Sequence, residues 1–203
     1  MSKNKVKFGI CNVHYAKLTL DENNVATWDT PVAIPGAVSI SLDANGETEY
    51  FYADNIAYYT INNNQGYDGD LEIALIPDSF REDIMGEAAD TNGVLVENKD
   101  AEVSNFALMF EFDGDVNKIR HVMYNCSASR PTIESETNEE SKEPKTEKLS
   151  LKSRPLPSGI VKAKTGDNVS EDVYNAWYDK VYEPVSTTTA TSTDETSDNE
   201  AVG

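Results

Sequence analysis

The sequence predicts a mainly β protein in which one or two helices cover one face of a sheet. Segments that alternate between apolar and polar residues recur along most of the chain, as in strands with one buried and one solvated face. Turn-forming pairs such as Asp113-Gly114 separate these segments. Only two segments carry helix-capping residues together with the apolar spacing of an amphipathic helix.

The predicted strands follow in chain order. KFGICNVHYAKLTL and VATW flank the turn-rich DENN, which predicts a hairpin. Residues 36–43 and 69–76 each alternate cleanly, and their apolar faces carry Val38, Ile40, Leu42, Leu71, Ile73 and Leu75. Residues 105–129 predict two strands joined at the Asp113-Gly114 turn, with Val122, Tyr124, Cys126 and Ala128 on one face of the second. A last strand, within 145–154, sets Leu149 and Leu151 against Lys148 and Ser150.

Two helices are predicted between and after these strands. In PDSFREDIMGE, Ser79 is the expected N-cap of a capping box with Glu82, and Gly86 is the expected stop. In SEDVYNAWYDKVYEP, a helix is expected to begin at Ser170 and to end before Pro184. Its stripe of Val173, Trp177 and Val181 predicts core packing rather than a partner surface.

The chain of 203 residues suits one domain, expected over residues 1–185. Residues 186–203 are acidic and rich in Ser and Thr, with too little apolar area to offset the entropy of ordering, so we expect a disordered tail.

The formal net charge of −19 argues against a protein that grips nucleic acid through its phosphates. There is no apolar run of about eighteen residues to cross a membrane, and MSKNKVKFGICNV lacks the apolar stretch of a signal peptide. Cys11 and Cys126 are too few for a disulfide framework, so we expect free thiols.

No pattern of catalytic or ligand-binding residues is present. His14 and His121, the two histidines, both lie in predicted strands, and neither they nor the cysteines have metal-site spacing. The sequence also lacks a phosphate-binding loop, a dinucleotide glycine pattern and a nucleophile elbow. We expect no enzyme activity, no metal and no cofactor.

Two polar connections are unusually long. The segment 44–66 joins two predicted strands and is dense in aromatic residues, namely Tyr50, Phe51, Tyr52, Tyr58 and Tyr59. It is expected to be a projecting loop that docks on another surface, or else a local aromatic mini-core. The segment 132–146 is almost devoid of apolar residues, so it is either a disordered loop or a hairpin that reaches other copies of the chain.

Several blocks of residues, in order from Phe8 to Pro184, resemble the major tail proteins of siphophages that infect Gram-positive hosts. They are KFGICNVHYA, TPVAIPGAVSISLD, FYADNIAYYT, GYDGDLEIALIPDSFREDIMGE, FALMFEFDGD, RHVMYNCSASRP and VYNAWYDKVYEP. The resemblance implies a β-sandwich or barrel-like tail-tube domain with one or two flanking helices and a long projecting hairpin and loop. It also implies hexameric rings that stack into a non-contractile tube, a conduit for DNA ejection.

In that assembly the strands near 36–43, 69–76, 122–131 and 145–154 would form the subunit's share of a continuous inner barrel. The residues expected to face the lumen are Ser39, Ser41, Asp43, Asp70, Glu72, Asn125 and Ser127. The aromatic residues of 44–66 would then make inter-subunit or ring-stacking contacts. The implied partners are other copies of the chain, a tape-measure protein, and tail terminator and distal tail proteins, with DNA passing through unbound. The implied location is the virion tail, assembled in the host cytoplasm.

A carbohydrate- or receptor-binding β-sandwich module is the alternative from another class. Such a module would arrange its aromatic residues around a pocket and would not polymerise.

Overall fold

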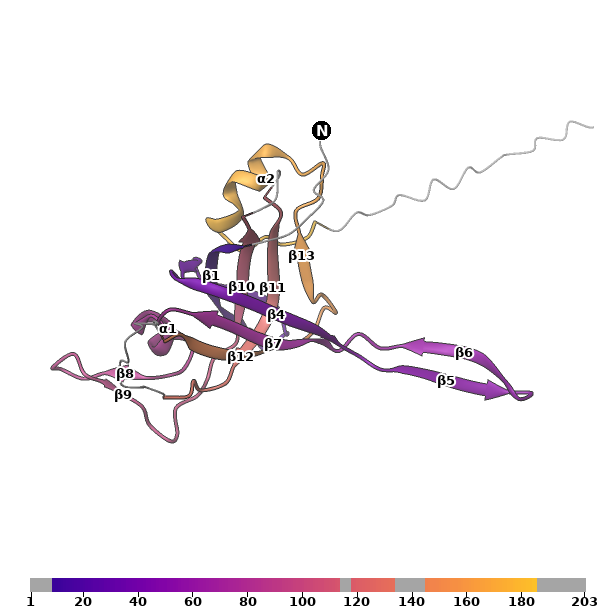
Figure 1. Ribbon diagram of the computed structural model, residues 1–203, viewed down its shortest axis with the longest axis horizontal. Helices are drawn as coiled ribbons and strands as arrows, with labels where there is room; N and C mark the ends of the chain where they lie inside the picture. The colour runs from indigo at the N-terminus through magenta and orange to yellow at the C-terminus, as the bar shows by residue number, and fades with distance from the viewer. Residues whose placement is uncertain (1–8, 114–117, 134–144, 186–203) are drawn as a thin grey trace, which may run out of the picture.

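The chain forms a nine-stranded antiparallel sheet with two short helices, as Figure 1 shows for the computed structural model. The structure describes residues 9–113, 118–133 and 145–185. The main path of the sheet runs β2-β1-β10-β11-β12-β7-β4, while β13 pairs with β11 and β3 pairs with β1. The strands of the sheet are β1 (Ile10–Leu20), β2 (Ala26–Trp28), β3 (Val32–Ala33), β4 (Ala37–Asn45), β7 (Gly66–Ile73), β10 (Phe106–Phe112), β11 (Arg120–Ala128), β12 (Glu147–Ser153) and β13 (Lys162–Lys164). The mainly β prediction is therefore confirmed.

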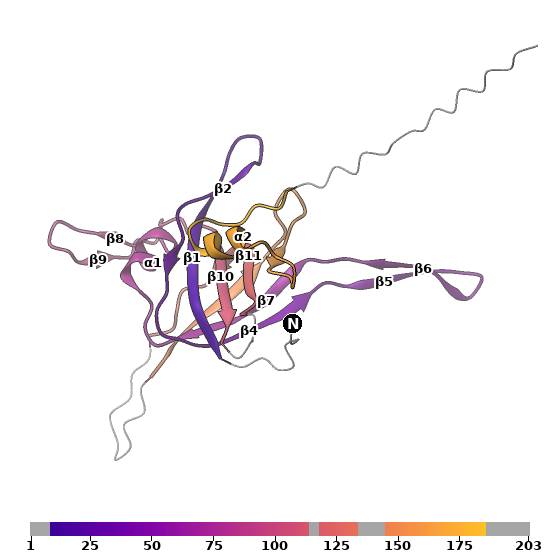
Figure 2. The same cartoon turned by 90° about the horizontal axis from the view of Figure 1, so that it is seen from above.

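Two further hairpins stand outside this sheet. One consists of β5 (Thr48–Ala53) and β6 (Ile56–Asn62), and the other of β8 (Ala88–Ala89) and β9 (Leu95–Val96). Figures 1 and 2 show them at opposite ends of the molecule, with β5–β6 extending far from the rest of the chain. The aromatic segment 44–66 is thus a projecting hairpin, here called the arm.

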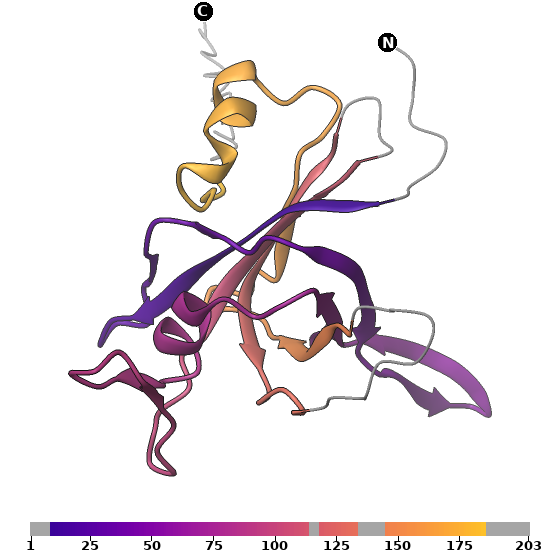
Figure 3. The ribbon, with the colours of Figure 1, turned by 60° about the vertical axis from the view of Figure 1, so that its left-hand side comes forward.

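The main sheet is bent, so that β4, β7 and β12 run across β1, β10 and β11 (Figures 1 and 3). The first core fills the space between these halves and includes Val13, Tyr15, Leu71, Ile73, Phe80, Phe106, Leu108, Met123, Leu149 and Leu151. The second core lies on the other side of β1, β10 and β11, under the C-terminal segment, and includes Ala16, Met109, Val122, Tyr124, Trp177 and Val181. The order of layers is therefore the half-sheet β4–β7–β12, the first core, the half-sheet β1–β10–β11, the second core and the C-terminal segment.

The two predicted helices exist, but one begins differently from the prediction. α1 (Asp78–Asp83) has Pro77 as its N-cap and no side-chain cap, so the predicted capping box of Ser79 is wrong. Pro77 has an extended backbone with φ −62° and ψ 145°, and the helix begins at Asp78, two residues before a helix capped by Ser79 would begin. Phe80 and Ile84 are fully buried, as their spacing predicts, and Gly86 turns the chain away with φ +75°.

The C-terminal helix is shorter than the prediction. Ser170 caps α2 (Glu171–Asn175) by accepting a hydrogen bond from the Val173 backbone N–H, and a 3₁₀ turn over Ala176–Tyr178 follows. Trp177 and Val181 are buried in the second core, which confirms that this stripe packs internally.

Both predicted hairpins are confirmed, but two bulges change which side chains share a face. β1 pairs with β2 and β10 pairs with β11, although the turn at 114–117 lies outside the described residues. A register shift between Ala37 and Ser39 leaves Val38 51% exposed, contrary to its predicted core position. A second register shift lies between β10 and β11 at Phe106–Leu108, and it places a bulge in β11. As a result Tyr124 packs in the second core and Cys126 in the first, so the predicted common face is wrong.

The remaining expectations concern single residues. Leu75 is 67% exposed because β7 ends at Ile73. Cys11 and Cys126 are free thiols, and burial raises the pKa of Cys126 to about 12, which keeps it protonated. His14 stacks on Tyr178 and His121 on Phe110, as in structural histidines. Among the described residues no helix has the length and apolar character to cross a membrane, and no cluster of metal-ligating side chains occurs there.

Candidate functional site: the polar face and the arm

Four adjacent strands, β11, β12, β7 and β4, present one polar face, and their register aligns it in rows. Ser39, Glu72 and Lys148 face one another across β4, β7 and β12, and Ser41, Asp70 and Ser150 form the next row. The third row is Asp43, Asp68, Lys152 and Ser127. These three rows are called the polar face. The intervening rows, which include Ile40, Leu71 and Leu149, turn toward the first core.

The structure therefore brings together six of the seven residues predicted for the lumen: Ser39, Ser41, Asp43, Asp70, Glu72 and Ser127. Asn125 lies at the β11 bulge, at one end of this group. Its side-chain amide donates to the Pro155 carbonyl, and its carbonyl oxygen accepts from the Asn105 amide at 2.9 Å.

Hydrogen bonds and ion pairs hold the carboxylates of β7 across the strands. Ser39 donates to Glu72 at 2.9 Å, and Ser150 donates to Asp70 at 2.8 Å. The Lys148 Nζ atom lies 2.9 Å from the other oxygen of Asp70. Hydrogen bonds from Lys148 and Ser150 lower the pKa of Asp70, and those from Thr146 and Ser39 lower the pKa of Glu72. These contacts are complete at neutral pH and are lost only as falling pH protonates the carboxylates.

The polar face is nearly balanced in charge, which the acids of β4 and β7 alone do not suggest. Four acids, Asp43, Asp68, Asp70 and Glu72, are accompanied by Lys148 and Lys152 of β12 and by Arg154. Arg154 pairs with Asp68, and Lys148 with Asp70. In the sequence, Lys148 and Ser150 alternate with two leucines, and this pattern is enough to place the basic side chains of β12 on the polar side of the strand. The pairing of β12 with β7, which decides their partners, is visible only in the fold.

β4 lies at the end of the sheet and pairs on one side only, with β7. Gly69 makes this pairing possible, because a Cβ atom at that position would lie 1.8 Å from the backbone oxygen of Ser41. The side of β4 away from β7 is a free edge among the described strands, and such an edge is a ready template for another strand.

The arm exposes most of its aromatic surface. Tyr50, Tyr52, Tyr58 and Tyr59 are 54%, 66%, 68% and 62% exposed, which rules out a closed local mini-core. Tyr50 pairs with Thr60, so Tyr50 and Tyr52 lie on one face of the hairpin and Tyr59 on the other. The side chain of Phe51 lies outside the described part of the structure. Exposed tyrosines on both faces suit a segment that contacts partners on two sides.

A buried polar cluster, not anticipated from the sequence, fastens the C-terminal segment to the sheet. Glu111 is 1% exposed, and its carboxylate lies 3.1 Å from Arg120 Nε and accepts a hydrogen bond from Asn12 at 2.7 Å. The Arg120 guanidinium stacks 3.8 Å from the Tyr174 ring and donates to the Tyr174 carbonyl. The paired charges satisfy each other and hold the segment over the second core.

These features define a class of protein: a mainly β protein with a two-layered core, a strand edge that is unpaired among the described residues and a projecting arm. The chain belongs to the phage tail tube protein family, whose profile matches residues 2–194. It is therefore a structural component of the phage tail tube, and so of the virion, and not an enzyme.

Two solved structures are also similar to the chain. One is the anti-feeding prophage cap, with 13% identity and a TM-score of 0.42, covering 81% of this chain and 95% of that one. The other is the anti-feeding prophage baseplate, with 10% identity and a TM-score of 0.44, covering 83% and 100%. A comparison with curated proteins gave no match.

Proposed function

We propose that the chain polymerises as stacked hexameric rings into the non-contractile tail tube of a siphophage of a Gram-positive host, through which DNA is ejected. The observation that carries this proposal is the set of four adjacent antiparallel strands with one buried face, one polar face and an open edge at β4. The tail tube in this proposal follows from family membership. The hexameric ring and the class of host follow from the resemblance of the sequence to siphophage major tail proteins.

The inner barrel of the tube is built from these four strands of every subunit. About 24 strands, spaced roughly 4.8 Å apart and tilted about 40°, close into a barrel about 48 Å across. Side chains of about 5 Å on each wall leave a lumen of about 38 Å. Duplex DNA, about 20 Å wide, passes without touching the wall.

The polar face lines this lumen, and the two cores form the wall behind it. Ser39, Ser41, Asp43, Asp70, Glu72, Asn125 and Ser127 are the proposed lumen residues. With Lys148 and Lys152 beside the acids, the wall repels phosphate less strongly than the acids alone would, and its effect reaches about 8 Å at physiological salt. Close internal pairing of the charges leaves few free cations to hold DNA.

The arm carries the proposed inter-subunit or ring-stacking contacts through Tyr50, Phe51, Tyr52, Tyr58 and Tyr59. The other proposed partners are a tape-measure protein inside the tube, and tail terminator and distal tail proteins at its ends. Assembly takes place in the host cytoplasm. Residues 1–185 are the assembling domain, and residues 186–203 are a dispensable acidic tail.

Electron microscopy of the purified chain tests the proposal. Rings or tubes with six-fold symmetry and a lumen of about 38 Å are expected. Compact single particles at all concentrations would instead favour a carbohydrate- or receptor-binding module.

Removing residues 186–203 is expected to leave tube formation intact. Beyond Val185 the only aliphatic side chains are Ala190, Ala201 and Val202, too few to anchor a contact. Negative-stain images of the chain that ends at Val185 should show tubes as abundant as those of the full chain. Loss of polymerisation in the shortened chain would show that the tail takes part in assembly.

Replacing Asp70 and Glu72 together by lysine is expected to make tubes that retain DNA at low salt. The double change turns the four acids and two bases of the polar face, beside which Arg154 lies, into two acids and four bases. Phosphates bind such a surface, and the binding weakens steeply as salt rises. DNA ejection from virions, followed at several salt concentrations, should be slowed at low salt only.

Glu22→Lys with Asp29→Lys is the matched control, because both residues are exposed, lie away from the polar face and give the same change of charge. If virions with lysines at positions 70 and 72 eject DNA at the normal rate at low salt, the polar face does not line the lumen.

A further inference from the structure

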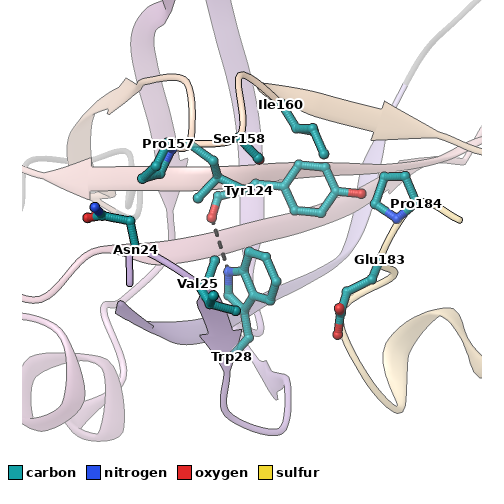
Figure 4. A pocket seen from close by; sticks show the side chains of 11 residues that line it. Asn24, Val25, Trp28, Tyr124, Pro157, Ser158, Ile160, Glu183 and Pro184 are labelled. Atoms are coloured by element: carbon teal, nitrogen blue, oxygen red, sulfur yellow. Dashed lines mark hydrogen bonds between the residues drawn. The ribbon is translucent and has the colours of Figure 1, made fainter. Parts of the chain in front are cut away.

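A pocket of about 270 Å³ opens on the layer of the molecule farthest from the polar face. Figure 4 shows that it is built from four separate segments: the β1–β2 turn and β2, Tyr124 of β11, the loop before β13, and the end of the C-terminal segment. Tyr124 and Leu156 in its wall belong to the second core. The pocket therefore lies beyond the second core, with both half-sheets between it and the polar face.

Aromatic rings form one wall of the pocket and are held by hydrogen bonds of their own. The Trp28 indole N–H donates to the Tyr124 carbonyl at 3.1 Å, and the two rings lie 5.6 Å apart. The Tyr124 hydroxyl donates to the Tyr182 carbonyl at 2.7 Å. Because the polar ends of both rings are already bonded, neither ring offers the pocket a hydrogen-bonding group. Tyr124 is 0% exposed and backs the wall from behind, so the half-buried Trp28 ring is the aromatic surface that a ligand can reach. Val25, Pro157 and Ile160 extend that surface.

Three polar side chains border the apolar surface: Asn24, Ser158 and Glu183. Within residues 9–113, 118–133 and 145–185, none of the three side chains makes a hydrogen bond or ion pair. Asn24 is fixed in place by the turn, where it has φ +61°. A mostly apolar hollow with a few converging polar groups is the usual form of a small-molecule site.

We propose that this pocket binds one neutral sugar ring, either free or at the end of a glycan chain. A sugar presents an apolar face of C–H groups to an aromatic wall and hydroxyls to amide, hydroxyl and carboxylate groups, which is the set present here. The volume lies just below the range typical of sites for drug-sized ligands, so it suits a single ring. Glu183 at the rim and the net charge of −19 disfavour an anionic ligand.

In the tube, the order of layers puts this pocket on the outer wall, where it can reach a glycan surface. That placement rests on the proposed function, whereas binding of sugar by the free subunit does not.

Saturation-transfer NMR on the purified full chain tests the inference. The probes are glucose, galactose, N-acetylglucosamine and rhamnose, their methyl glycosides, and glucuronate as the anionic counterpart. A ligand of about twelve heavy atoms is expected to bind with a Kd in the millimolar range, on the order of 1–10 mM. At least one neutral sugar should give a signal and glucuronate none. Equal binding of the methyl glycoside indicates recognition of a glycan end, and binding of the reducing sugar alone indicates a free monosaccharide.

Single substitutions then test whether the sugar that gives the NMR signal is bound in this pocket. Ser158→Ala and Glu183→Ala change exposed rim residues and leave the core intact, and each is expected to weaken binding about fivefold or more. Asp172→Ala and Lys180→Ala, which line the neighbouring hollow over the C-terminal segment, are the matched controls and should bind normally.

Three results would overturn the inference: no transfer from any neutral sugar at roughly 50 mM, well above the expected Kd; binding of glucuronate as strong as that of neutral sugars; or a signal unchanged in both rim variants. Loss of the signal when subunits form tubes would show that a neighbouring copy fills the pocket, and would overturn its placement on the outer wall. Images of the same samples report tube formation separately, so a failure of sugar binding leaves the tube proposal standing.

Discussion

Replacing Gly69 by alanine is expected to separate β4 from β7 and to abolish tube formation. The added Cβ atom would lie 1.8 Å from the Ser41 backbone oxygen and 2.8 Å from its carbonyl carbon. Backbone atoms cannot rotate away as the end of a side chain can, so the strand itself must move. Displacement of β4 would expose Ile40 and Leu42 of the first core and distort the free edge at which a neighbouring subunit is proposed to pair.

The cost is expected to be about 3 kcal/mol or more, which lowers the Tm of a domain of this size by about 6–12 °C. Thermal unfolding followed by circular dichroism, with electron microscopy of the same sample, measures both effects. Gly166→Ala is the matched control, because no atom lies within 4 Å of its added Cβ. A Tm for the Gly69 variant within about 2 °C of the wild-type value would show that the strands absorb the clash.

Replacing Tyr58 and Tyr59 together by serine is expected to prevent polymerisation while the subunit stays folded. Both rings are more than 60% exposed, so their removal takes nothing from either core. In an assembly each buried aromatic ring contributes on the order of 2 kcal/mol, and the loss recurs at every subunit of the tube. Sedimentation should show subunits at concentrations where the wild type forms tubes, with an unchanged circular dichroism spectrum.

Tyr58→Phe with Tyr59→Phe is the matched control, since it keeps the rings and removes only the hydroxyls. It should polymerise nearly as well as the wild type. Unfolding of the serine variant would mean that the arm supports the fold of the subunit, and normal tubes would mean that the stacking contacts lie elsewhere.

The strand pattern of this protein could be predicted from the sequence because alternation directly reflects burial. Residues 39–43 and 70–72 fall on the faces that their polarity predicts, and the four strands assigned to one sheet are adjacent in it. Val38 and Tyr124 depart from the pattern because a bulge adds one residue, and one residue reverses every face beyond it. Gly36, with φ +81°, directly precedes the bulge in β4, whereas no such residue marks the bulge in β11.

The contacts between distant segments could not be predicted. Lys148 meets Asp70 only because β12 pairs with β7, and Glu111 meets Arg120 and Asn12 only because β10 lies between β1 and β11. The pocket beside Trp28 draws on four segments spread over most of the chain. A single sequence indicates which side chains are buried and which are exposed, but their partners depend on the order of strands in the sheet.

The bulge in β11 has a mechanical consequence. Ahead of it, Val122 and Tyr124 belong to the second core, and after it, Cys126 and Ala128 belong to the first. One continuous strand thus packs into both cores and pairs with β10 on one side and β12 on the other, so it belongs to both halves of the bent sheet. Force applied to β12 therefore reaches β10 through the covalent backbone of β11 and its hydrogen bonds, and not through side-chain contacts alone. In the proposed tube, the two half-sheets therefore separate at β11 only if its backbone hydrogen bonds to β10 or to β12 break.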